Sequence, residues 1–505
     1  MTIYKGFDEA KNGSIIPVFL SGRSMESRYN PQRDAEALCN SIEAGFSFFL
    51  VLGIGSGLFL EKLLEKFPHA KIIAVERYND DIDFLLQNSL LKKINNDHSL
   101  VICSLDQLEK KLIENYIPAK YGNLKIIEQR AWINENSEIT GQIKSIIEKG
   151  LGIISADYSV QAHFGKLWTS NILNNAVLAA RYETVNCFDF TESQLNKIAV
   201  IIAAGPSLDR TISMLSASDN YFIIATDTAS LSLLNKGIIP DVIISIDGQA
   251  VSYNHFLNKK KSSENGNQKQ PLYGFDLCSN TSALQHIISS GGKFFFFSSG
   301  HPLASAINSS LGLPFPSLFS GAGTVTITAL DFALQAGFKK LIILGADFSY
   351  QNGKAYTSGT YLDALYNKDS YKLYGSEQNF AKLMFRTELK EISPNIKTTQ
   401  ILEAYKTSME NYLSEKNISF TYKDNIYSLE CNDSAYQKAD KNKSRKNSHL
   451  SLKPFFDNIK ASSPEEIELL LLPYLAWLRN RSEYQKLSYS DLLKLALDDI
   501  VRYNI

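Results

Sequence analysis

The sequence predicts an α/β protein with two Rossmann-like, doubly wound parallel-sheet domains and a C-terminal helical domain. Three observations predict this class: short apolar runs without polar alternation, glycine-rich turns directly after such runs, and amphipathic helical segments between them. Strands of a parallel sheet are covered on both faces, so they read as continuous apolar runs. With 505 residues, the chain is long enough for two or three domains.

The first predicted domain, residues 1–150, rests on a stretch that begins FFLVLGIGSG. The sequence passes there from an apolar run through a glycine-rich turn and an amphipathic helix to a second apolar run. This is the pattern of a βαβ unit. The turn holds Gly53, Gly55 and Gly57, and Glu76 ends the second strand; this spacing resembles the nucleotide-binding loop of class I methyltransferases. Two interpretations stay open: a nucleotide site, or glycines that only permit close packing beside a solvated Glu76.

The rest of the chain divides into three predicted segments. These are a helical connector at 151–195, a central α/β domain at 196–375 and the helical domain at 376–505. The expected strands of the central domain are Ala199–Ala203, Tyr221–Ala225, Val242–Ile246, Lys293–Phe297 and Lys340–Leu344. The expected C-terminal helices are Thr399–Glu415, Pro464–Asn480 and Ser488–Tyr503.

Composition excludes several classes of protein. The chain has 52 Lys plus Arg against 53 Asp plus Glu, so no global positive field attracts nucleic acid or anionic lipid. Its five cysteines include no CxxC pair, which argues against a disulfide framework or a zinc ribbon and favours a reducing compartment. The N-terminus lacks the features of a secretory signal, and the apolar runs are too short for a membrane span. We therefore expect a cytoplasmic protein.

The carboxyl ends of the central strands are the expected ligand site, because open α/β sheets bind ligands there. After the first strand, Gly205, Pro206 and Ser207 form a turn at the start of a helix, where free N–H groups favour an anion. The alternative is an ordinary turn with a serine cap. Asp227 and Asp247 follow the next two strands, where they would bind ribose or base groups or a magnesium ion, or would only cap helices.

Two further groups of residues belong to the same predicted edge. Ser320, Gly321 and Thr324 open the helix before the last strand and suit a phosphate or carboxylate, and Gly345 and Asp347 leave that strand towards the same cleft. Downstream, two phenols flank a QNGK turn, where they would donate hydrogen bonds to a leaving phosphate or would simply be packed. These are Tyr350 and Tyr356.

The segments IIAAGPSLD, KGIIPDVIISID and GTVTITALDFALQAGFKKLIILGADFSYQNGK together resemble the motility accessory factors, which are bacterial flagellin glycosyltransferases. RYNPQRDAEAL and HFGKLWTSNILNNA also look like that family. The central domain is similar to bacterial sialyltransferases that use CMP-sialic acid, with a GPS-containing first turn, an SG-led helix and an IDFYQNGxxY-like segment. By this resemblance, the GPS turn with Ser320 and Gly321 would hold the nucleotide, and Tyr350 and Tyr356 would assist the leaving phosphate.

The chain departs from this pattern at the general base. The sialyltransferases carry a histidine downstream of the tyrosine pair, and the accessory factors often carry one directly after the GK, where this chain has Ala355 and Tyr356. The remaining candidates for the base are Asp347, Asp363 and His301.

The resemblance implies transfer of a nonulosonic acid, pseudaminic- or legionaminic-like, from a CMP-sugar to Ser or Thr of flagellin, in support of flagellar assembly and motility. The expected partners are flagellin and the nucleotide sugar, with no nucleic acid and no required cofactor, although magnesium remains an option. The central domain is also similar to the archaeal 6-hydroxymethylpterin diphosphokinases, which would use ATP and magnesium, with Asp227 and Asp247 as metal ligands. A third hypothesis is a flagellin-binding protein whose catalytic site has degenerated.

Overall fold

The computed structural model describes residues 2–217, 219–257, 269–310, 315–321, 323–368, 384, 387–431 and 452–502. The chain divides into two compact units. Unit 1 comprises Met1–Lys166 and Leu471–Asp499, and unit 2 comprises Leu167–Leu470 and Ile500–Ile505.

Unit 1 holds a four-stranded parallel sheet in the order β5-β4-β3-β6 and a β1-β2 hairpin. Its strands are β1 (Tyr4–Glu9), β2 (Ile15–Phe19), β3 (Phe48–Leu52), β4 (Lys71–Glu76), β5 (Leu100–Ser104) and β6 (Leu124–Glu128). Its shorter helices are α1 (Pro31–Asn40), α2 (Leu58–Lys66), α3 (Asn79–Leu85), α4 (Ser89–Ile94), α5 (Leu105–Asn115), α6 (Pro118–Tyr121) and α7 (Arg130–Glu135). All five residues of β3 are buried, as expected of a strand covered on both faces.

Three helices belong partly to each unit. They are α8 (Thr140–Arg181), α19 (Pro464–Arg479) and α20 (Tyr489–Val501).

Unit 2 is built on an eight-stranded sheet in the order β11-β10-β9-β8-β7-β12-β17-β16. Its strands are β7 (Ile198–Ile202), β8 (Tyr221–Thr226), β9 (Val242–Ser245), β10 (Leu272–Asp276), β11 (Lys293–Phe297), β12 (Lys340–Leu344), β16 (Ser419–Lys423) and β17 (Ile426–Glu430). The six strands from β11 to β12 are parallel, and β17 and β16 continue the sheet antiparallel. A small separate sheet contains β13 (Tyr350–Gln351), β14 (Lys390–Ser393) and β15 (Ile396–Thr398).

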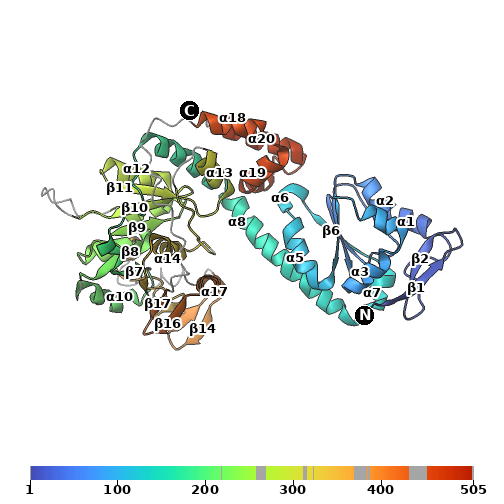
Figure 1. Ribbon diagram of the computed structural model, residues 1–505, viewed down its shortest axis with the longest axis horizontal. Helices are drawn as coiled ribbons and strands as arrows, with labels where there is room; N and C mark the ends of the chain where they lie inside the picture. Colours follow the sequence, from blue (N-terminus) through green and yellow to red (C-terminus); the bar gives the residue numbers. More distant parts are fainter. Residues whose placement is uncertain are drawn as a thin grey trace. The chain divides into compact units, whose positions relative to one another are not determined.

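The helices of unit 2 connect and cover these strands (Figure 1). They are α9 (Glu192–Leu195), α10 (Leu208–Thr211), α11 (Asp227–Asn235), α12 (Thr281–Ser289), α13 (Pro302–Ser310), α14 (Val325–Ala336), α15 (Tyr361–Lys368), α17 (Gln400–Glu415) and α18 (Lys453–Ala461). Helix α14 packs against β7, β8 and β9. Ten of its twelve residues are buried, so it is the central helix of this layer.

The order of strands reverses between β7 and β12. From β7 the chain moves outward through β8, β9, β10 and β11, and it then returns to place β12 on the other side of β7. Such a reversal is the topological switch point of a doubly wound sheet, and the crevice beyond it is where ligands bind in this class of fold.

The predicted fold class is confirmed, and the structure adds elements that were not expected. Strand β10 was missed because Gly274 interrupts its apolar pattern; a Cβ there would lie 2.4 Å from the Phe295 ring, so the strand needs a glycine for packing. The β1-β2 hairpin and strands β14 to β17 were also missed, so the segment after 375 is not wholly helical.

The two units do not follow the expected segment boundaries. Helix α8 runs through the boundary expected at 150, and Leu471–Asp499 belong to unit 1 rather than to a separate helical domain. The boundary expected at 375 lies outside the described residues.

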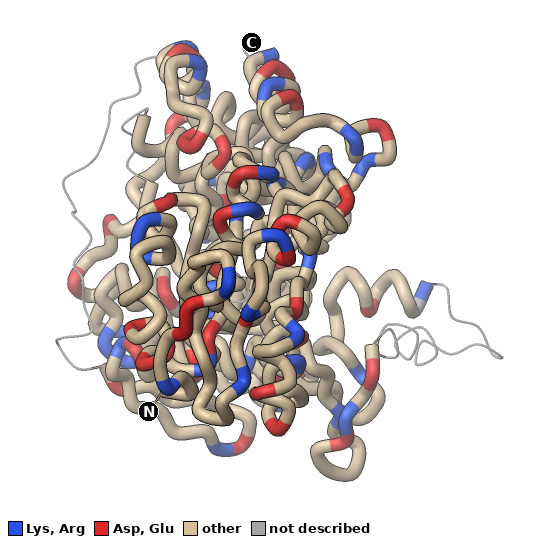
Figure 2. The backbone as a smooth tube through the Cα atoms, turned by 90° about the vertical axis from the view of Figure 1, so that its right-hand side faces the viewer, with Lys and Arg blue, Asp and Glu red and all other residues tan. Residues whose placement is uncertain are grey.

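Surface charge and cysteine chemistry add little that is specific. Figure 2 shows Lys and Arg interspersed with Asp and Glu along the chain. No disulfide joins the cysteines in the described chain, and four of them are buried. Across the described ranges, no helix combines the length and apolar character needed to cross a membrane.

Candidate functional site at the switch point

Two loops meet at the carboxyl ends of β7 and β12. The Gly205 N–H donates to Gly345 O at 2.8 Å, and the Ser207 N–H donates to Asp347 Oδ2 at 2.7 Å. The structure therefore brings together Gly205, Pro206, Ser207, Gly345 and Asp347, which the sequence placed at one edge.

The contact between these loops requires both glycines. A Cβ at Gly345, whose φ is +71°, would lie 2.2 Å from Ala203 O. A Cβ at Gly205 would lie 2.4 Å from Gly345 O and 2.6 Å from Asp347 Oδ2. The room beside Gly205, where a phosphate was expected, is thus filled by Asp347.

Two buried polar atoms of this contact have no hydrogen-bond partner among the residues that the structure describes. They are Ser207 Oγ and Asp347 Oδ1. Burial raises the pKa of the Asp347 carboxyl, against the opposing effects of the Ser207 hydrogen bond and the positive charge of Arg210. Ser207 does not cap α10 with its side chain, so the simple capping alternative does not account for it.

The segment that carries Tyr356 is tied to the same loop. The Thr357 N–H donates to Ala204 O at 2.9 Å. The Asp209 carboxylate accepts from Thr357 Oγ1 at 2.6 Å and from the Ser358 N–H at 2.8 Å. Although burial opposes it, these hydrogen bonds hold the pKa of Asp209 below its ordinary value. The QNGK turn is therefore anchored at the switch point.

The two predicted phenols lie close to one another within a partly buried cluster. Tyr350 and Tyr356 pack with Ala355 and Met384, together with other partly buried side chains. Burial and then the neighbouring phenols, Tyr350 first, raise the pKa of Tyr356 to about 12. Both phenols are protonated at neutral pH and can donate a hydrogen bond, but Tyr356 is packed rather than standing free at the mouth of a cleft.

Asp227 and Asp247 form a second group, at the ends of β8 and β9. Asp227 accepts from the Thr228 N–H at 2.7 Å and from Ser245 Oγ at 2.7 Å, so both of its oxygens are engaged. Asp247 accepts from the Gln249 N–H at 2.9 Å, and its pKa is raised by burial and by the charge of Asp227. In the described part of the chain no group of three potential ligands is placed to hold a metal. Asp227 is the first residue of α11, after the N-cap Thr226, and its carboxylate takes up the Thr228 N–H of that first turn.

Ser320, Gly321 and Thr324 lie in the turn that leads into α14. Ser320 Oγ donates to Ser299 O at 3.5 Å, and a Cβ at Gly321 would lie 2.5 Å from Ser408 Oγ of α17. Thr324 is the N-cap residue of α14 but makes no side-chain cap hydrogen bond. The contacts of this turn are thus with the β11 loop and α17 rather than with the Gly205 loop.

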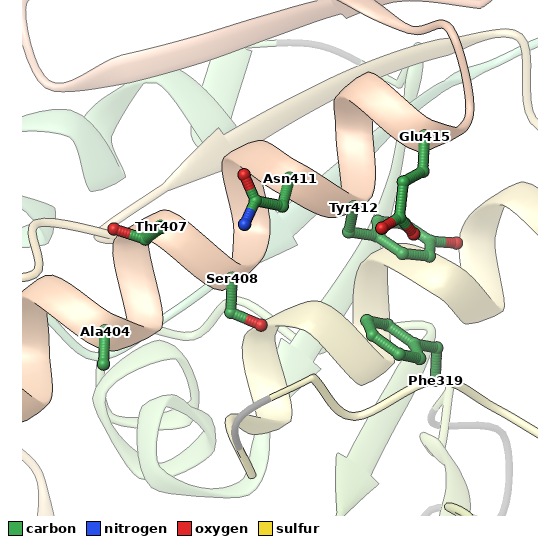
Figure 3. A pocket seen from close by; sticks show the side chains of 7 residues that line it. All are labelled: Phe319, Ala404, Thr407, Ser408, Asn411, Tyr412 and Glu415. Carbon is green, nitrogen blue, oxygen red and sulfur yellow. The ribbon is translucent and has the colours of Figure 1, made fainter. Parts of the chain in front are cut away.

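A pocket of about 430 Å³ lies beside this turn (Figure 3). The rings of Phe319 and Tyr412 stack with centroids 5.0 Å apart. The other residues that line the pocket all belong to α17 and are Ala404, Thr407, Ser408, Asn411 and Glu415. An aromatic wall with hydroxyl and amide groups suits a sugar or a peptide segment.

His301 is poorly suited to act as the general base. Its Nδ1 accepts from the Leu303 N–H at 3.2 Å, so in the neutral ring Nε2 carries the proton. Burial lowers the pKa of His301 to about 4. Asp363 accepts from the Gly359 N–H at 2.8 Å at the start of α15, whereas Asp347 and Asp209 are the carboxylates that bond the loops of the switch point.

Sequence reasoning missed two asparagines that hold the edge loops in place. Asn171 Nδ2 on α8 donates to Gly248 O and to Cys278 O, both at 3.0 Å. Asn175 Nδ2, one turn later, donates to Leu277 O at 2.9 Å and to Ser279 O at 2.8 Å. The available signal was a pair of amides at i and i+4 on a helix rich in apolar residues.

Glu76 of unit 1 is not a solvated strand end. It is fully buried, and its Oε1 accepts from the Ile54 N–H at 2.8 Å and from the Tyr4 hydroxyl at 3.0 Å. Its Oε2 accepts from Trp132 Nε1 at 2.6 Å. The carboxyl therefore joins β4, the glycine-rich loop, β1 and α7 from inside.

We expect the stability of unit 1 to fall as the pH rises through neutrality. Burial raises the pKa of Glu76 from 4.5 to about 7. Because the folded pKa is the higher one, this stability is complete below about pH 4.5 and is lost as the pH rises through about 7, by up to ~3 kcal/mol. Urea midpoints measured between about pH 5 and pH 8 should therefore fall. Glu76→Gln should reduce the slope without removing it, because burial also raises the pKa of Glu26 in this unit to about 7. The exposed Glu43→Gln control should keep the wild-type slope; an equally steep slope in Glu76→Gln would contradict the assignment.

Comparison with known proteins relates the central part of the chain to a protein family. Residues 170–353 match the family model described as 6-hydroxymethylpterin diphosphokinase MptE-like. This stretch is similar to the MptE-like family. It contains β7 to β12 and both loops of the switch point.

Two Treponema pallidum (strain Nichols) proteins, each described as an uncharacterized protein, are similar in sequence. One is 34% identical over 145 residues, which are 28% of this chain and 67% of that protein. The other is 28% identical over 239 residues, which are 45% of this chain and 75% of that protein. The chain belongs to the same family as the first of them.

The structure of the MAf glycosyltransferase from Magnetospirillum magneticum AMB-1 superposes with a TM-score of 0.54 at 14% identity, over 100% of this chain and 87% of that chain. At this identity the likeness shows a shared fold. The predicted resemblance, a diphosphokinase-like central domain within a motility accessory factor fold, is confirmed by the two findings together.

Proposed function

We propose that the protein is a glycosyltransferase that transfers a nonulosonic acid, pseudaminic- or legionaminic-like, from a CMP-sugar to Ser or Thr of flagellin, in support of flagellar assembly and motility. The observation that carries the proposal is the pair of buried, unpartnered atoms at the switch point, Ser207 Oγ and Asp347 Oδ1. Buried polar atoms are nearly always hydrogen-bonded, so an orphaned pair at this position favours a ligand that completes it. The shared fold with a glycosyltransferase supports the same class of reaction.

The transfer breaks the bond between the anomeric carbon and the phosphate oxygen, and CMP leaves with the bonding electrons. The acceptor hydroxyl oxygen forms the new bond to that carbon and gives up its proton. An oxocarbenium-like transition state needs little covalent help, so the protein has to hold the phosphate and remove the proton.

We propose that Asp347 Oδ1 takes the proton from the acceptor hydroxyl and that Ser207 Oγ contacts the CMP-sugar. The second oxygen of Asp347 stays bound to the Ser207 N–H, which fixes the carboxylate in place. Its raised pKa makes it a stronger base than an ordinary aspartate. Tyr350 keeps its proton and is the phenol we assign to the leaving phosphate, since burial raises its pKa as well.

The test incubates the full chain with several CMP-nonulosonates and flagellin, and it measures the mass of flagellin. Asp347→Asn should lower the rate at least about 100-fold with CMP affinity retained, because a general base contributes that much. Ser207→Ala should instead weaken CMP binding about tenfold. Asp457→Asn, an exposed carboxylate on α18, is the matched control. Folded protein that neither modifies flagellin nor binds CMP would refute the proposal.

A second candidate, pyrophosphoryl transfer from ATP to a hydroxymethylpterin, is favoured by the match of residues 170–353 to the MptE-like model. Within the described ranges, Asp227 and Asp247 are not joined by a third carboxylate, histidine or cysteine placed to hold a metal with them, which gives their predicted role as magnesium ligands no support. Magnesium-dependent ATP binding without CMP binding, together with release of AMP in the presence of the pterin, would favour this candidate.

The third candidate is a flagellin-binding protein without catalysis. It is favoured because the chain has Ala355 and Tyr356 directly after the GK, where the accessory factors often carry a histidine. Complementation of a motility defect separates it from a transferase. A binding protein would keep its effect with Asp347→Asn, whereas a transferase would lose it.

A further inference from the structure

The glycine-rich loop of unit 1 already binds a carboxylate of its own chain. Glu26 Oε1 accepts from the Ser56 N–H and from Ser56 Oγ, both at 2.7 Å. Ser56 lies between the left-handed Gly55 (φ +64°) and Gly57 (φ +90°), directly before α2. In Rossmann units this is the position where the loop offers its N–H groups to the phosphate of a ligand.

Side chains fill the space that the glycines leave. A Cβ at Gly55 would lie 2.5 Å from Glu26 Oε1. A Cβ at Gly53 would lie 2.7 Å from the Trp132 side chain and 2.9 Å from Met25 Cε. Met25 is buried, and the second oxygen of Glu26 is buried without a hydrogen-bond partner among the described residues. The loop is therefore packed against its own chain at the place where a pyrophosphate would approach.

The position of the ribose is filled in the same way. The carboxylate at the end of the second strand, Glu76, would accept hydrogen bonds from ribose hydroxyls in a nucleotide-binding unit. Here its acceptor positions are taken by the Tyr4 hydroxyl, the Trp132 indole and the Ile54 N–H. Tyr4 lies on β1 and Glu26 follows β2, so the N-terminal segment supplies one contact to each of the two ligand positions.

We propose that residues 2–30 form a built-in plug, with Glu26 as the intramolecular ligand that keeps the glycine-rich loop of unit 1 closed to nucleotide phosphates. The Glu26 carboxyl, whose pKa burial raises to about 7, and a phosphate both accept hydrogen bonds and would compete for the same two donors on Ser56. A phosphate can therefore enter only after Glu26 has left. The inference does not depend on the activity proposed for unit 2.

The test measures hydrogen exchange of the peptide that covers residues 53–58 in the full chain. In the wild type, adding inorganic phosphate, AMP or S-adenosylmethionine should leave the exchange unchanged. In Glu26→Ala, the Ser56 amide should exchange at least about tenfold faster, and inorganic phosphate should slow it again. Glu43→Ala removes an exposed carboxylate and should behave as the wild type.

Two results would overturn the proposal: slowed exchange in the wild-type loop on adding phosphate or either nucleotide, or a folded Glu26→Ala chain that phosphate does not protect. If Glu26→Ala fails to fold, Glu26→Asp serves in its place, since the shorter side chain withdraws the carboxylate from Ser56 and should also speed exchange. The wild-type measurement decides independently of any variant.

Discussion

Gly345→Ala should destabilise unit 2 by about 3 kcal/mol or more and abolish CMP binding. The residue has φ +71°, and a Cβ would lie 2.2 Å from Ala203 O. The left-handed backbone costs about 1–2 kcal/mol for a residue with a side chain, and the contact with a backbone oxygen adds to this because neither loop can yield without breaking the pairing of β7 and β12. Urea unfolding and CMP titration measure the two effects.

Gly237→Ala is the matched control for this variant. Gly237 has φ +77°, close to that of Gly345, but no atom of the described residues lies within 4 Å of its added Cβ. It should lose only the backbone contribution, about 1–2 kcal/mol, and keep CMP binding. Equal losses of stability in the two variants would mean that the approach of the two loops is unimportant.

Gly165→Ala should lower the free energy of unfolding of unit 1 more than any other glycine-to-alanine substitution in that unit. Gly165 lies on α8 where this helix meets α19, and an added Cβ would lie 1.8 Å from Pro473 O. The helices would have to separate, so we expect a loss of about 3 kcal/mol or more in the free energy of unfolding. Fluorescence of Trp132 and Trp477 during urea unfolding reports this change.

Gly152→Ala tests the same substitution on the same helix without the contact. In the described part of the chain, no atom lies within 4 Å of a Cβ at Gly152. Because alanine favours a helix by about 1 kcal/mol over glycine, this variant should gain stability. The two substitutions should thus change the free energy of unfolding in opposite directions. A stabilised Gly165→Ala chain would show that α19 does not pack as described.

Continuous apolar runs made most of the parallel sheets predictable. Strand β10 escaped because Gly274 leaves room for the Phe295 ring, a requirement that only the neighbouring strand reveals. Strands β16 and β17 escaped because β16 is exposed along its whole length, so its pattern is not that of a buried strand. These strands depend on partners distant in sequence, which periodicity does not report.

The location of the site was predictable from the sequence, but the hydrogen bonds between its residues were not. The rule that ligands bind beyond the carboxyl ends of strands pointed to Ser207 and Asp347. That the Asp347 carboxylate would bond the Ser207 N–H, across 140 residues, follows only from strand order. For the same reason, the sequence left open whether Glu76 was solvated, whereas the structure buries it among Tyr4 and Trp132.

The measurement that tests the central claim most directly is hydrogen exchange of the wild-type chain with and without CMP. The account predicts slower exchange in the peptides covering residues 203–211 and 345–358, with no change in the loop at 53–58. Protection of the loop at 53–58, or of α17 without any at the switch point, would contradict it.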